Sequence, residues 1–489
     1  MTASSPPSGV DYDRKWHVMI ATGLGIFLGT IDASIVNVAL PTISDDLDTT
    51  FATVQWVVIA YLLTLATLTL SVGRLGDMLG KKRIYTAGFA VFTAGSALCG
   101  FAPGIETLIG ARVIQALGAA MIFALGMAII TQAFPPSERG RALGISGALV
   151  SVGIVIGPSL GGFIVDQWSW RWIFIVNLPI GFFGTAAAQR FVPAVPPLGG
   201  QRFDYKGAGV FFVALFTFML GLSLAQARGF SSPAVAGLLV AGLGALAVFI
   251  AVERSVEQPM LDLELFSDRL LTINLVTGWI TFFAISGLFI LVPFYLENAL
   301  GASPREVGLL IAPAPLLLGI SAPISGSMSD RIGPRRVLVF GLAILVGTYL
   351  LMLLLHADSP PWLVAAIMAP AGLGMGIFQS PNNSAIMGTA PSERLGVTSA
   401  MLTITRNTGQ LTGISVLGAI WALRVASHHG SPIDAQSAPG VSQAAALRDV
   451  GVVNAVLIAI ALALSLWGLV EEKRGSRNQK EDSRSVSSS

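Results

Sequence analysis

Fourteen apolar runs separated by short polar segments constrain this fold more than any other feature of the chain. A bilayer core about 30 Å thick needs roughly 20 apolar residues per helix, and each run is close to that length. Only 11% of the 489 residues are charged, against about 25% in soluble domains. We therefore predict an all-α polytopic membrane protein with fourteen transmembrane helices. The predicted spans are 18–40, 51–71, 83–101, 106–131, 141–165, 171–189, 207–228, 233–252, 271–296, 305–329, 336–356, 362–388, 396–423 and 449–470.

The distribution of positive charge predicts the orientation. If the N-terminus is cytoplasmic, 22 of the 29 Lys and Arg residues fall in cytoplasmic segments, five in outer segments and two inside helices. This asymmetry agrees with the positive-inside rule. We expect both termini to be cytoplasmic, and we expect the charged, Ser-rich tail 471–489 to be disordered.

The chain also contains an internal repeat. The stretch GRLGDMLGKKR at 73–83 recurs as GSMSDRIGPRR at 326–336, and PSERGRALG at 136–144 recurs as PSERLGVTS at 391–399. The two offsets, 253 and 255, are nearly equal, which indicates two duplicated halves of six helices with two extra helices inserted between them. Such paired halves are typical of transporters. The expected segments are 1–17 (N-terminal tail), 18–190 (first half), 191–270 (linker with two helices), 271–470 (second half) and 471–489 (C-terminal tail).

The repeated basic loop combines glycines, which let helix ends approach closely, with an aspartate that can bind a helix N-terminus. At this loop the chain resembles the major facilitator superfamily, whose loop has the pattern G-x-L-[AG]-D-[RK]-x-G-R-[RK]. The resemblance implies the major facilitator fold and a cytoplasmic latch, with Asp77 docking across the two halves in the outward-open state. A basic loop that only sets topology is the alternative. The expected latch residues are Gly73, Asp77, Gly80, Arg83, Asp330 and Arg336.

Three ionisable residues lie well inside predicted helices: Asp32, Arg112 and Arg406. Such charges are costly in a bilayer, at about 2.5–3.5 kcal/mol each. With a rise of 1.5 Å per residue, Asp32 and Arg112 lie roughly 12 and 9 Å below the same membrane face. A nearby arginine lowers an aspartate pKa and burial raises it, so a pair at this depth could load and release a proton. A static salt bridge between the two helices is the alternative.

Further motifs resemble those of the fourteen-helix drug:proton antiporters: IDASIVNVALP around Asp32, RVIQALGAA from Arg112, and GIVIGPSLGG at 153–162. The resemblance implies a proton-relay role for Arg112. It also implies that the third motif forms a bent, close-packed helix at the interface between the halves, because proline removes a helical hydrogen bond and glycines thin the helix. Ordinary small-residue packing is the alternative. The motif residues are Gly153, Gly157, Pro158, Gly161 and Gly162.

Polar residues in the other helices are candidates for a substrate cavity. Amides buried in a membrane need hydrogen-bond partners, so these residues either contact substrate or join helices to one another. The candidates are Asn37, Gln55, Gln115, Gln379, Asn383, Arg406 and Asn407.

Together these features predict a proton-coupled antiporter that exports hydrophobic or cationic drugs across the plasma membrane of a bacterium. A dedicated exporter of one endogenous metabolite, lipid or self-made antibiotic is the alternative, and a receptor-like or scaffolding membrane protein is the rival outside transporters. We expect a functional monomer whose partners are drug-like molecules, protons and membrane lipids. We expect no nucleic-acid partner and no cofactor. We expect no metal and no catalytic residue either, because no histidine lies deep in a helix or at metal-ligand spacing.

Overall fold

The computed structural model describes residues 12–49, 51–196, 202–261, 263–391, 394–431 and 438–487, and all regular structure among them is helical. The first half comprises α1 (Lys15–Asp46), α2 (Phe51–Val54), α3 (Trp56–Leu79), α4 (Lys81–Gly100), α5 (Ile105–Ala133), α6 (Arg139–Gln167), α7 (Trp172–Ile175) and α8 (Asn177–Phe191). The inserted pair is α9 (Tyr205–Arg228) and α10 (Pro233–Ser255). The second half comprises α11 (Arg269–Phe294), α12 (Pro304–Ile311), α13 (Pro313–Ile332), α14 (Pro334–Leu351), α15 (Pro361–Thr389), α16 (Leu395–His429) and α17 (Gly440–Ser487).

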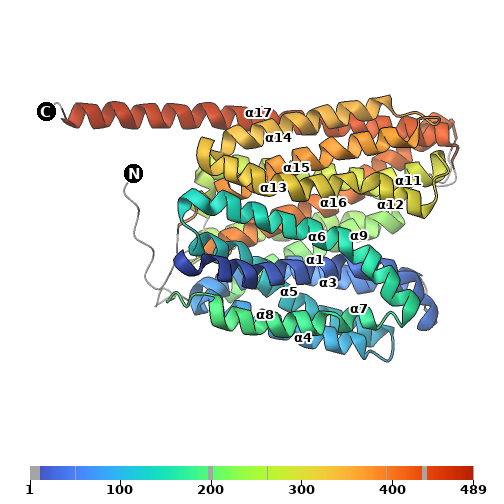
Figure 1. The fold of residues 1–489 in the computed structure, drawn as a ribbon, viewed down its shortest axis with the longest axis horizontal. Coiled ribbons are helices and arrows are strands. Elements are labelled where there is room, and N and C mark those ends of the chain that lie inside the picture. Colours follow the sequence, from blue (N-terminus) through green and yellow to red (C-terminus); the bar gives the residue numbers. More distant parts are fainter. Residues whose placement is uncertain are drawn as a thin grey trace.

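Each of the fourteen predicted spans coincides with one helix or with two consecutive helices. Among the described residues, thirteen helical stretches are long and apolar enough to cross a membrane. The fourteenth, α4, is 20 residues long and begins with Lys81, Lys82 and Arg83, so its apolar part is shorter. It still lies lengthwise in the bundle, packed against α5 and α8 (Figure 1). The structure therefore agrees with the predicted fold class.

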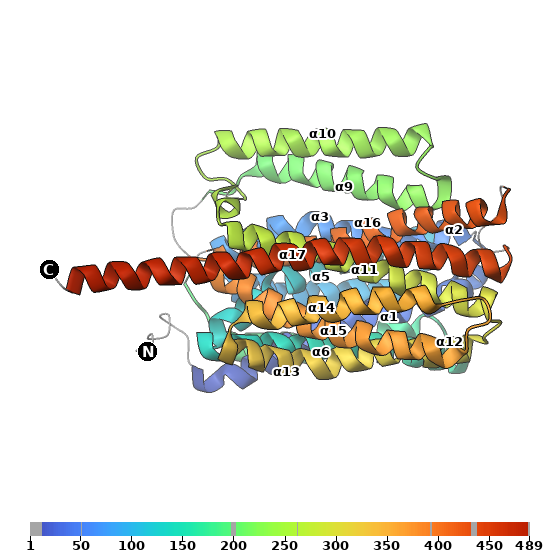
Figure 2. The same ribbon diagram turned by 90° about the horizontal axis from the view of Figure 1, so that it is seen from above.

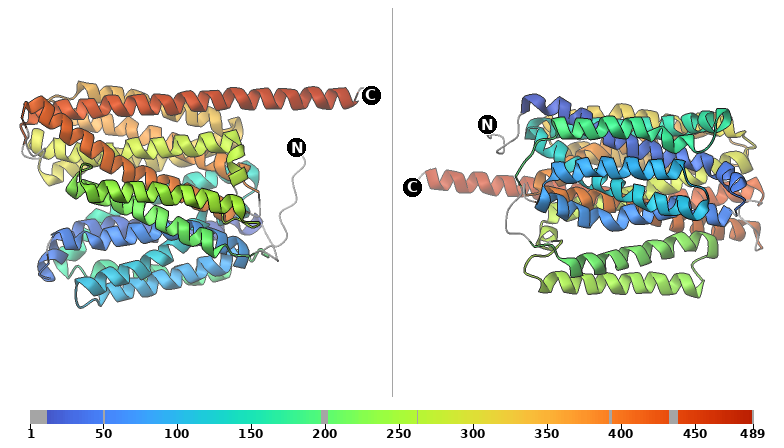
Figure 3. Two further views of the ribbon diagram at one scale, coloured as in Figure 1. Left: turned by 180° about the vertical axis from the view of Figure 1, so that it is seen from behind. Right: turned by 90° about the horizontal axis from the view of Figure 1, so that it is seen from below.

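The helices run side by side, and α1 begins at the same end of the bundle at which α17 ends (Figure 1). We call this end the terminal end. The inserted helices α9 and α10 pack against each other and stand beside the bundle (Figures 2 and 3). Of the two, α9 contacts α3 of the first half and α16 of the second half. The Ser415 hydroxyl of α16 donates a hydrogen bond to the Leu222 carbonyl of α9 at 2.9 Å. The inserted pair thus contacts both halves through α9.

Each half has its own apolar core. The larger core contains residues of α1, α3, α4, α5 and α6, and another core contains residues of α11, α14, α15 and α17. Val397, Ala400 and Met401, in the first two turns of α16, belong to the first core although their helix belongs to the second half. This shared packing joins the two halves near the terminal end.

The C-terminal segment differs from the disordered tail that we expected. The structure continues α17 as one helix to Ser487. Extending an existing helix requires no new nucleation. The continuation projects beyond the bundle at the terminal end (Figure 1).

Candidate functional site

The first half encloses a polar network centred on Asp32 of α1. Arg112 of α5 donates to Asp32 through Nη1 at 2.7 Å, and both side chains are buried. Gln115, one turn after Arg112, donates to Asp32 at 2.8 Å and accepts from Arg112 at 2.5 Å. Asn177, the first residue of α8, donates to Asp32 at 2.8 Å. The carboxylate therefore accepts three hydrogen bonds inside an apolar shell, two of them from neutral amides.

Further contacts hold Arg112 in a fixed orientation. Its Nε donates to the Val57 carbonyl of α3 at 3.1 Å. Its guanidinium lies over the Tyr61 ring at 4.1 Å and near the Phe174 ring at 5.6 Å, which are cation–π distances. Ser96 of α4 accepts from Gln115 at 2.5 Å. The network thus draws on α1, α3, α4, α5, α7 and α8, all from the first half.

The sequence identified part of this network. Asp32 and Arg112 were predicted as a pair, and the structure brings them into contact. Gln115 was assigned to the substrate cavity, but it is fully buried in the ion-pair network instead. Gln115 follows Arg112 by three residues, which places both side chains on one face of the helix. This spacing could have predicted that Gln115 belongs to the ion-pair network. Ser96 and Asn177 were missed: nothing in the sequence distinguishes Ser96 from other small polar residues in helices, and Asn177 lies in the stretch WRWIFIVNLPIG at 170–181 without being selected as a site residue.

Asp77 of α3 lies at the contact between the halves. Its two carboxylate oxygens accept from the backbone N–H groups of Gly396 at 3.0 Å and Val397 at 3.1 Å, in the first turn of α16. Lys81 forms an ion pair with Asp77 at 2.7 Å. A Cβ added at Gly73 would lie 2.7 Å from the Gly396 carbonyl, so this close approach requires glycine. A helix N-terminus of one half thus binds a carboxylate of the other half.

The second half repeats this contact. Asp330 of α13 accepts from the backbone N–H groups of Gly140 at 2.7 Å and Arg141 at 2.9 Å, in the first turn of α6. Gly326 approaches Gly140 so closely that a Cβ on either residue would collide with the backbone of the other. The two contacts are equivalent under the sequence repeat, and we call them the paired latches.

The remaining latch candidates have different positions. Gly80 and Gly333 each end one helix and begin the next with a positive φ, of 98° and 90°, which favours glycine. Arg83 and Arg336 are exposed rather than part of the halves' contact. The neighbouring Arg335 is the buried cation instead, and it donates to the Gly468 carbonyl of α17 at 3.1 Å. Arg83 and Arg336 were predicted as latch residues, but in this structure neither lies at the contact between the halves.

The glycine motif of α6 packs within the first half. A Cβ added at Gly153 or Gly161 would lie 2.9 or 2.7 Å from side-chain atoms of α1, and Gly157 also meets α1. Pro158 lies inside α6, and Gly162 has open space around its Cα. The same helix contacts α13 of the other half through Gly140, Gly144 and Gly147 instead. Six residues turn a helix by about 240° from Gly147 to Gly153, so Gly153, Gly157 and Gly161 face α1. Pro158 and Gly162 are turned by only about 20° and 60° from Gly147, so they lie on the side of α6 that faces the other half.

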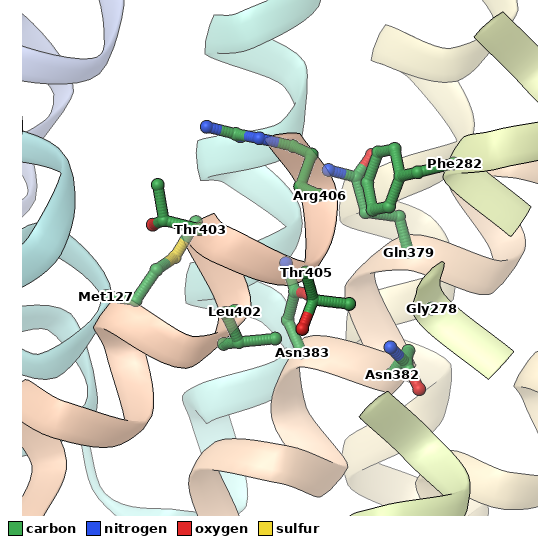
Figure 4. Close-up of a pocket in the computed structure, with 10 residues that line it drawn as sticks. All are labelled: Met127, Gly278, Phe282, Gln379, Asn382, Asn383, Leu402, Thr403, Thr405 and Arg406. Atoms are coloured by element: carbon green, nitrogen blue, oxygen red, sulfur yellow. The ribbon is translucent and has the colours of Figure 1, made fainter. Parts of the chain in front are cut away.

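A small pocket of about 30 Å³, open to solvent at its mouth, lies among α5, α11, α15 and α16. Polar side chains of α15 and α16 form much of its wall, with Phe282 of α11 and Met127 of α5 (Figure 4). Arg406 is the cation in this wall, and its guanidinium is 5.6 Å from the Phe123 ring of α5. The polar wall residues are Gln379, Asn382, Asn383, Thr403, Thr405 and Arg406.

Three of the seven predicted cavity residues meet in this pocket: Gln379, Asn383 and Arg406. Asn37 is exposed and donates to the Ala33 carbonyl of its own helix at 3.2 Å. The other three predicted residues, Gln55, Gln115 and Asn407, do not line the pocket. Asn382, which belongs to the same polar patch of α15 as Gln379 and Asn383, joins the wall and is 3% exposed.

At the end opposite the latches, Asp46 of α1 accepts from Trp170 Nε1 and from Arg171 Nη1, each at 2.8 Å. Both hydrogen bonds lower the pKa of Asp46 from its ordinary value, and the one from Trp170 has the larger effect. All three residues belong to the first half, so this ion pair does not join the two halves. Among the described residues, no group of three or more His, Cys, Asp or Glu side chains is placed to hold a metal ion.

Comparison with known proteins agrees with this geometry. The family model of the Major Facilitator Superfamily matches residues 22–414, and a second match covers 275–488. The chain belongs to the Major Facilitator Superfamily. It is therefore a membrane transporter by family, with the two-half architecture described above.

Named relatives include transporters of more than one kind. The riboflavin transporter RibZ of Clostridioides difficile is 36% identical over 84% of this chain and 89% of its own length. The multidrug resistance protein Stp of Mycobacterium tuberculosis is 36% identical over 83% of this chain and 75% of its own. The multidrug transporter protein MdtP of Bacillus subtilis is 31% identical over 83% and 76%.

A solved structure shares the fold. The human organic anion transporter MFSD10 aligns with a TM-score of 0.64 over 92% of this chain and 99% of its own, at 15% identity. At that identity the likeness supports the arrangement of helices and nothing about substrate.

Proposed function

We propose that this superfamily member is a proton-coupled antiporter, which exports drug-like molecules from the cytoplasm of a bacterium by alternating access. The observation that carries the proposal is the buried Asp32–Arg112 ion pair with its amide partners. An ionisable pair held inside a membrane protein is costly and therefore marks a functional site. Two multidrug transporters among the relatives support the drug-like substrate.

The network suggests how protonation would act. With Asp32 charged, its carboxylate holds Arg112, Gln115 and Asn177 around it, which fixes α1, α5 and α8 together. Protonation removes the charge that these donors favour, and the ion pair weakens. The packing of α1, α5 and α8 then loosens. In the proposed cycle a proton entering from outside neutralises Asp32, and its release to the cytoplasm restores the pair.

A single helix connects this network to the pocket. Arg112 lies on α5, and so do Phe123, which faces Arg406, and Met127 in the pocket wall. Eleven residues separate Arg112 from Phe123, or roughly 16 Å along the helix axis. A shift of α5 that follows protonation would therefore reach the pocket through a rigid element.

The paired latches join the halves at the terminal end in this structure. With cytoplasmic termini, as the positive-charge distribution predicts, the cytoplasmic end is closed and the state corresponds to an outward-facing one. Opening to the cytoplasm would require both latches to separate.

Dye uptake into inside-out vesicles tests the coupling, with Asp32→Asn compared with wild type in the presence and absence of a protonophore. We expect gradient-dependent uptake in wild type and its loss in Asp32→Asn. Because removing one partner of a buried pair costs about 3–5 kcal/mol, the double variant Asp32→Asn/Arg112→Gln removes both charges and separates lost coupling from lost folding.

A matched control lies on the same helix. Asp46→Asn changes an exposed, ion-paired carboxylate of α1 and is expected to keep gradient-dependent uptake. Full gradient-dependent uptake by a well-folded Asp32→Asn variant would refute the assignment of the coupling residue.

A dedicated transporter of one metabolite is the second candidate, favoured by the similarity to the riboflavin transporter. The same vesicles test it with riboflavin, whose fluorescence reports uptake. Riboflavin uptake that is not inhibited by a panel of drug-like dyes would favour this candidate over the multidrug exporter.

A further inference from the structure

The pocket between the halves contains a cation and no acid. Its wall includes Arg406, amides and hydroxyls of α15 and α16, and apolar side chains, but no Asp or Glu among the described residues. Asp32 is enclosed in the first-half network, and Asp77 is bound to the first turn of α16. Both of these carboxylates are therefore committed elsewhere. A cationic substrate in this pocket would meet like charge without a counter-ion.

Arg406 has donors to offer a substrate. A guanidinium carries five N–H donors in a planar fork and prefers planar carboxylates. Among the described residues, the Arg406 guanidinium contacts the Phe123 ring at 5.6 Å and forms no hydrogen bond or ion pair, so its N–H donors are available. Figure 4 shows the Arg406 side chain extending from α16 away from Phe282 and Gln379. A ligand anion beside this group would gain charge-assisted hydrogen bonds next to an aromatic face.

The rest of the pocket favours a polar ring system. Asn382 is 3% exposed, and its Oδ1 is buried with no hydrogen-bond partner in the described structure. Such an acceptor is satisfied by an N–H or O–H donor on a ligand. Gly278 faces the Asn382 amide, since a Cβ there would lie 3.2 Å from its Nδ2, so the wall is thin at this point. Phe282 supplies an apolar surface for a ring.

We propose that this pocket binds planar anionic substrates, with a carboxylate or similar anion at Arg406 and a hydrogen-bond donor at Asn382. The proposal deepens the proposed export function and rests on it. It also narrows the substrate class that the sequence suggested, because hydrophobic and anionic compounds fit the charge of the wall whereas cations do not. The position agrees with such a role, since Arg406 is ten residues, roughly 15 Å, along α16 from the latch residue Gly396.

Two dyes of one scaffold and opposite charge test the proposal by fluorescence polarisation on the purified full-length protein. Fluorescein carries a carboxylate, and rhodamine 123 is a cation on the same xanthene ring. We expect wild type to bind fluorescein at least about tenfold more tightly than rhodamine 123, as one charge-assisted contact permits. This comparison needs no variant, so it holds even if substitutions at Arg406 impair folding.

Variants then assign the selectivity to Arg406. Arg406→Gln should weaken fluorescein binding by about tenfold or more and leave rhodamine 123 binding equal or stronger, whereas Arg406→Lys should keep the preference for fluorescein. Arg424→Gln, on the same helix but paired with Asp449, serves as the control and should change neither affinity. A purely structural role of Arg406 would weaken both dyes together.

The outcomes separate this proposal from the export function. Tighter binding of rhodamine 123 than of fluorescein by wild type, or unchanged fluorescein affinity in folded Arg406→Gln, would overturn the anionic substrate class. Gradient-driven transport of rhodamine 123 in that case would still support the antiporter. Fluorescein binding that depends on Arg406, with no gradient-driven transport of either dye, would support the substrate class and count against the antiporter.

Discussion

Loss of the Asp77 latch should open the terminal end of the bundle. Asp77→Asn removes the charge and one of the two acceptors that receive the N–H groups of Gly396 and Val397. A hydrogen bond to a charged group contributes about 1.5–3 kcal/mol, and the charge at a helix N-terminus adds about 0.3–1 kcal/mol. The buried carboxylate recovers part of its hydration when the latch opens, which offsets some of this gain. We expect a net shift of about 1.4–2.8 kcal/mol, or 10- to 100-fold in the open population.

Thiol labelling measures this shift. Met387 is 1% exposed and packs between the halves against Ala128 of α5 and Leu395 of α16. In inside-out vesicles, whose outer surface is the cytoplasmic one, a Met387→Cys variant should therefore react with a membrane-impermeant maleimide only when the halves separate at this end. The native Cys99 is fully buried and gives a low background. While the open state is a minority, the labelling rate follows its population, so Asp77→Asn should raise that rate about 10- to 100-fold.

The repeat provides an internal test and a control. Asp330→Asn breaks the equivalent contact with Gly140 and Arg141, and it should raise the rate of labelling at Met387→Cys in the same direction. Asp46→Asn removes a carboxylate whose partners all lie within the first half and should leave the rate unchanged. Equal labelling rates in wild type, Asp77→Asn and Asp330→Asn would refute the view that these contacts hold the halves together.

Two further predictions concern other parts of the fold. Gly207→Ala should lower the melting temperature, because the added Cβ would collide with the buried carboxylate of Glu253 at the base of the inserted helices. A melting temperature equal to that of wild type would show that this carboxylate can move aside. Asp46 has a lowered pKa in the folded protein because Trp170 and Arg171 donate hydrogen bonds to it. Its contribution to stability is therefore present above the unfolded-state pKa near 3.8, and it is lost as the pH falls through the lower pKa of the folded state. Asp46→Asn should therefore reduce thermal stability at pH 6, with the difference vanishing in acid; a difference that persists at the lowest pH would contradict this assignment.

The sequence could predict the helices and the latches because these depend on local rules. Apolar run length decides whether a helix can span a bilayer, and the repeated loop places an aspartate at equivalent positions in both halves. The depth of Asp32 and Arg112 also follows from helical rise alone, and the structure joins them at 2.7 Å. These features need no knowledge of which face a helix turns toward its neighbours.

Helix facing is what the sequence could not supply. In a chain that is apolar on nearly every face, polarity does not reveal which side of a helix meets a neighbour, lipid or a cavity. Gln115 was therefore assigned to the cavity although it completes the ion-pair network, and three of the α6 motif glycines, Gly153, Gly157 and Gly161, pack against α1 of their own half. Arg336 was selected as a latch residue for the same reason. One residue turns a helix by about 100°, so Arg336 is exposed while its neighbour Arg335 is buried.

The two halves keep equivalent latches but differ in their interiors, and this difference bears on mechanism. In the first half, Asp32 and Arg112 neutralise each other among amides, away from the wall of the pocket. In the second half, Arg406 stands in the wall of a pocket without an acidic partner there. We infer a division of labour, with proton binding in the first half and substrate binding largely in the second. On this view α5 is the mechanical link, because one rigid helix carries Arg112 at the ion pair and Phe123 against Arg406. Competition between proton and substrate would then arise from helix position rather than from a shared binding site.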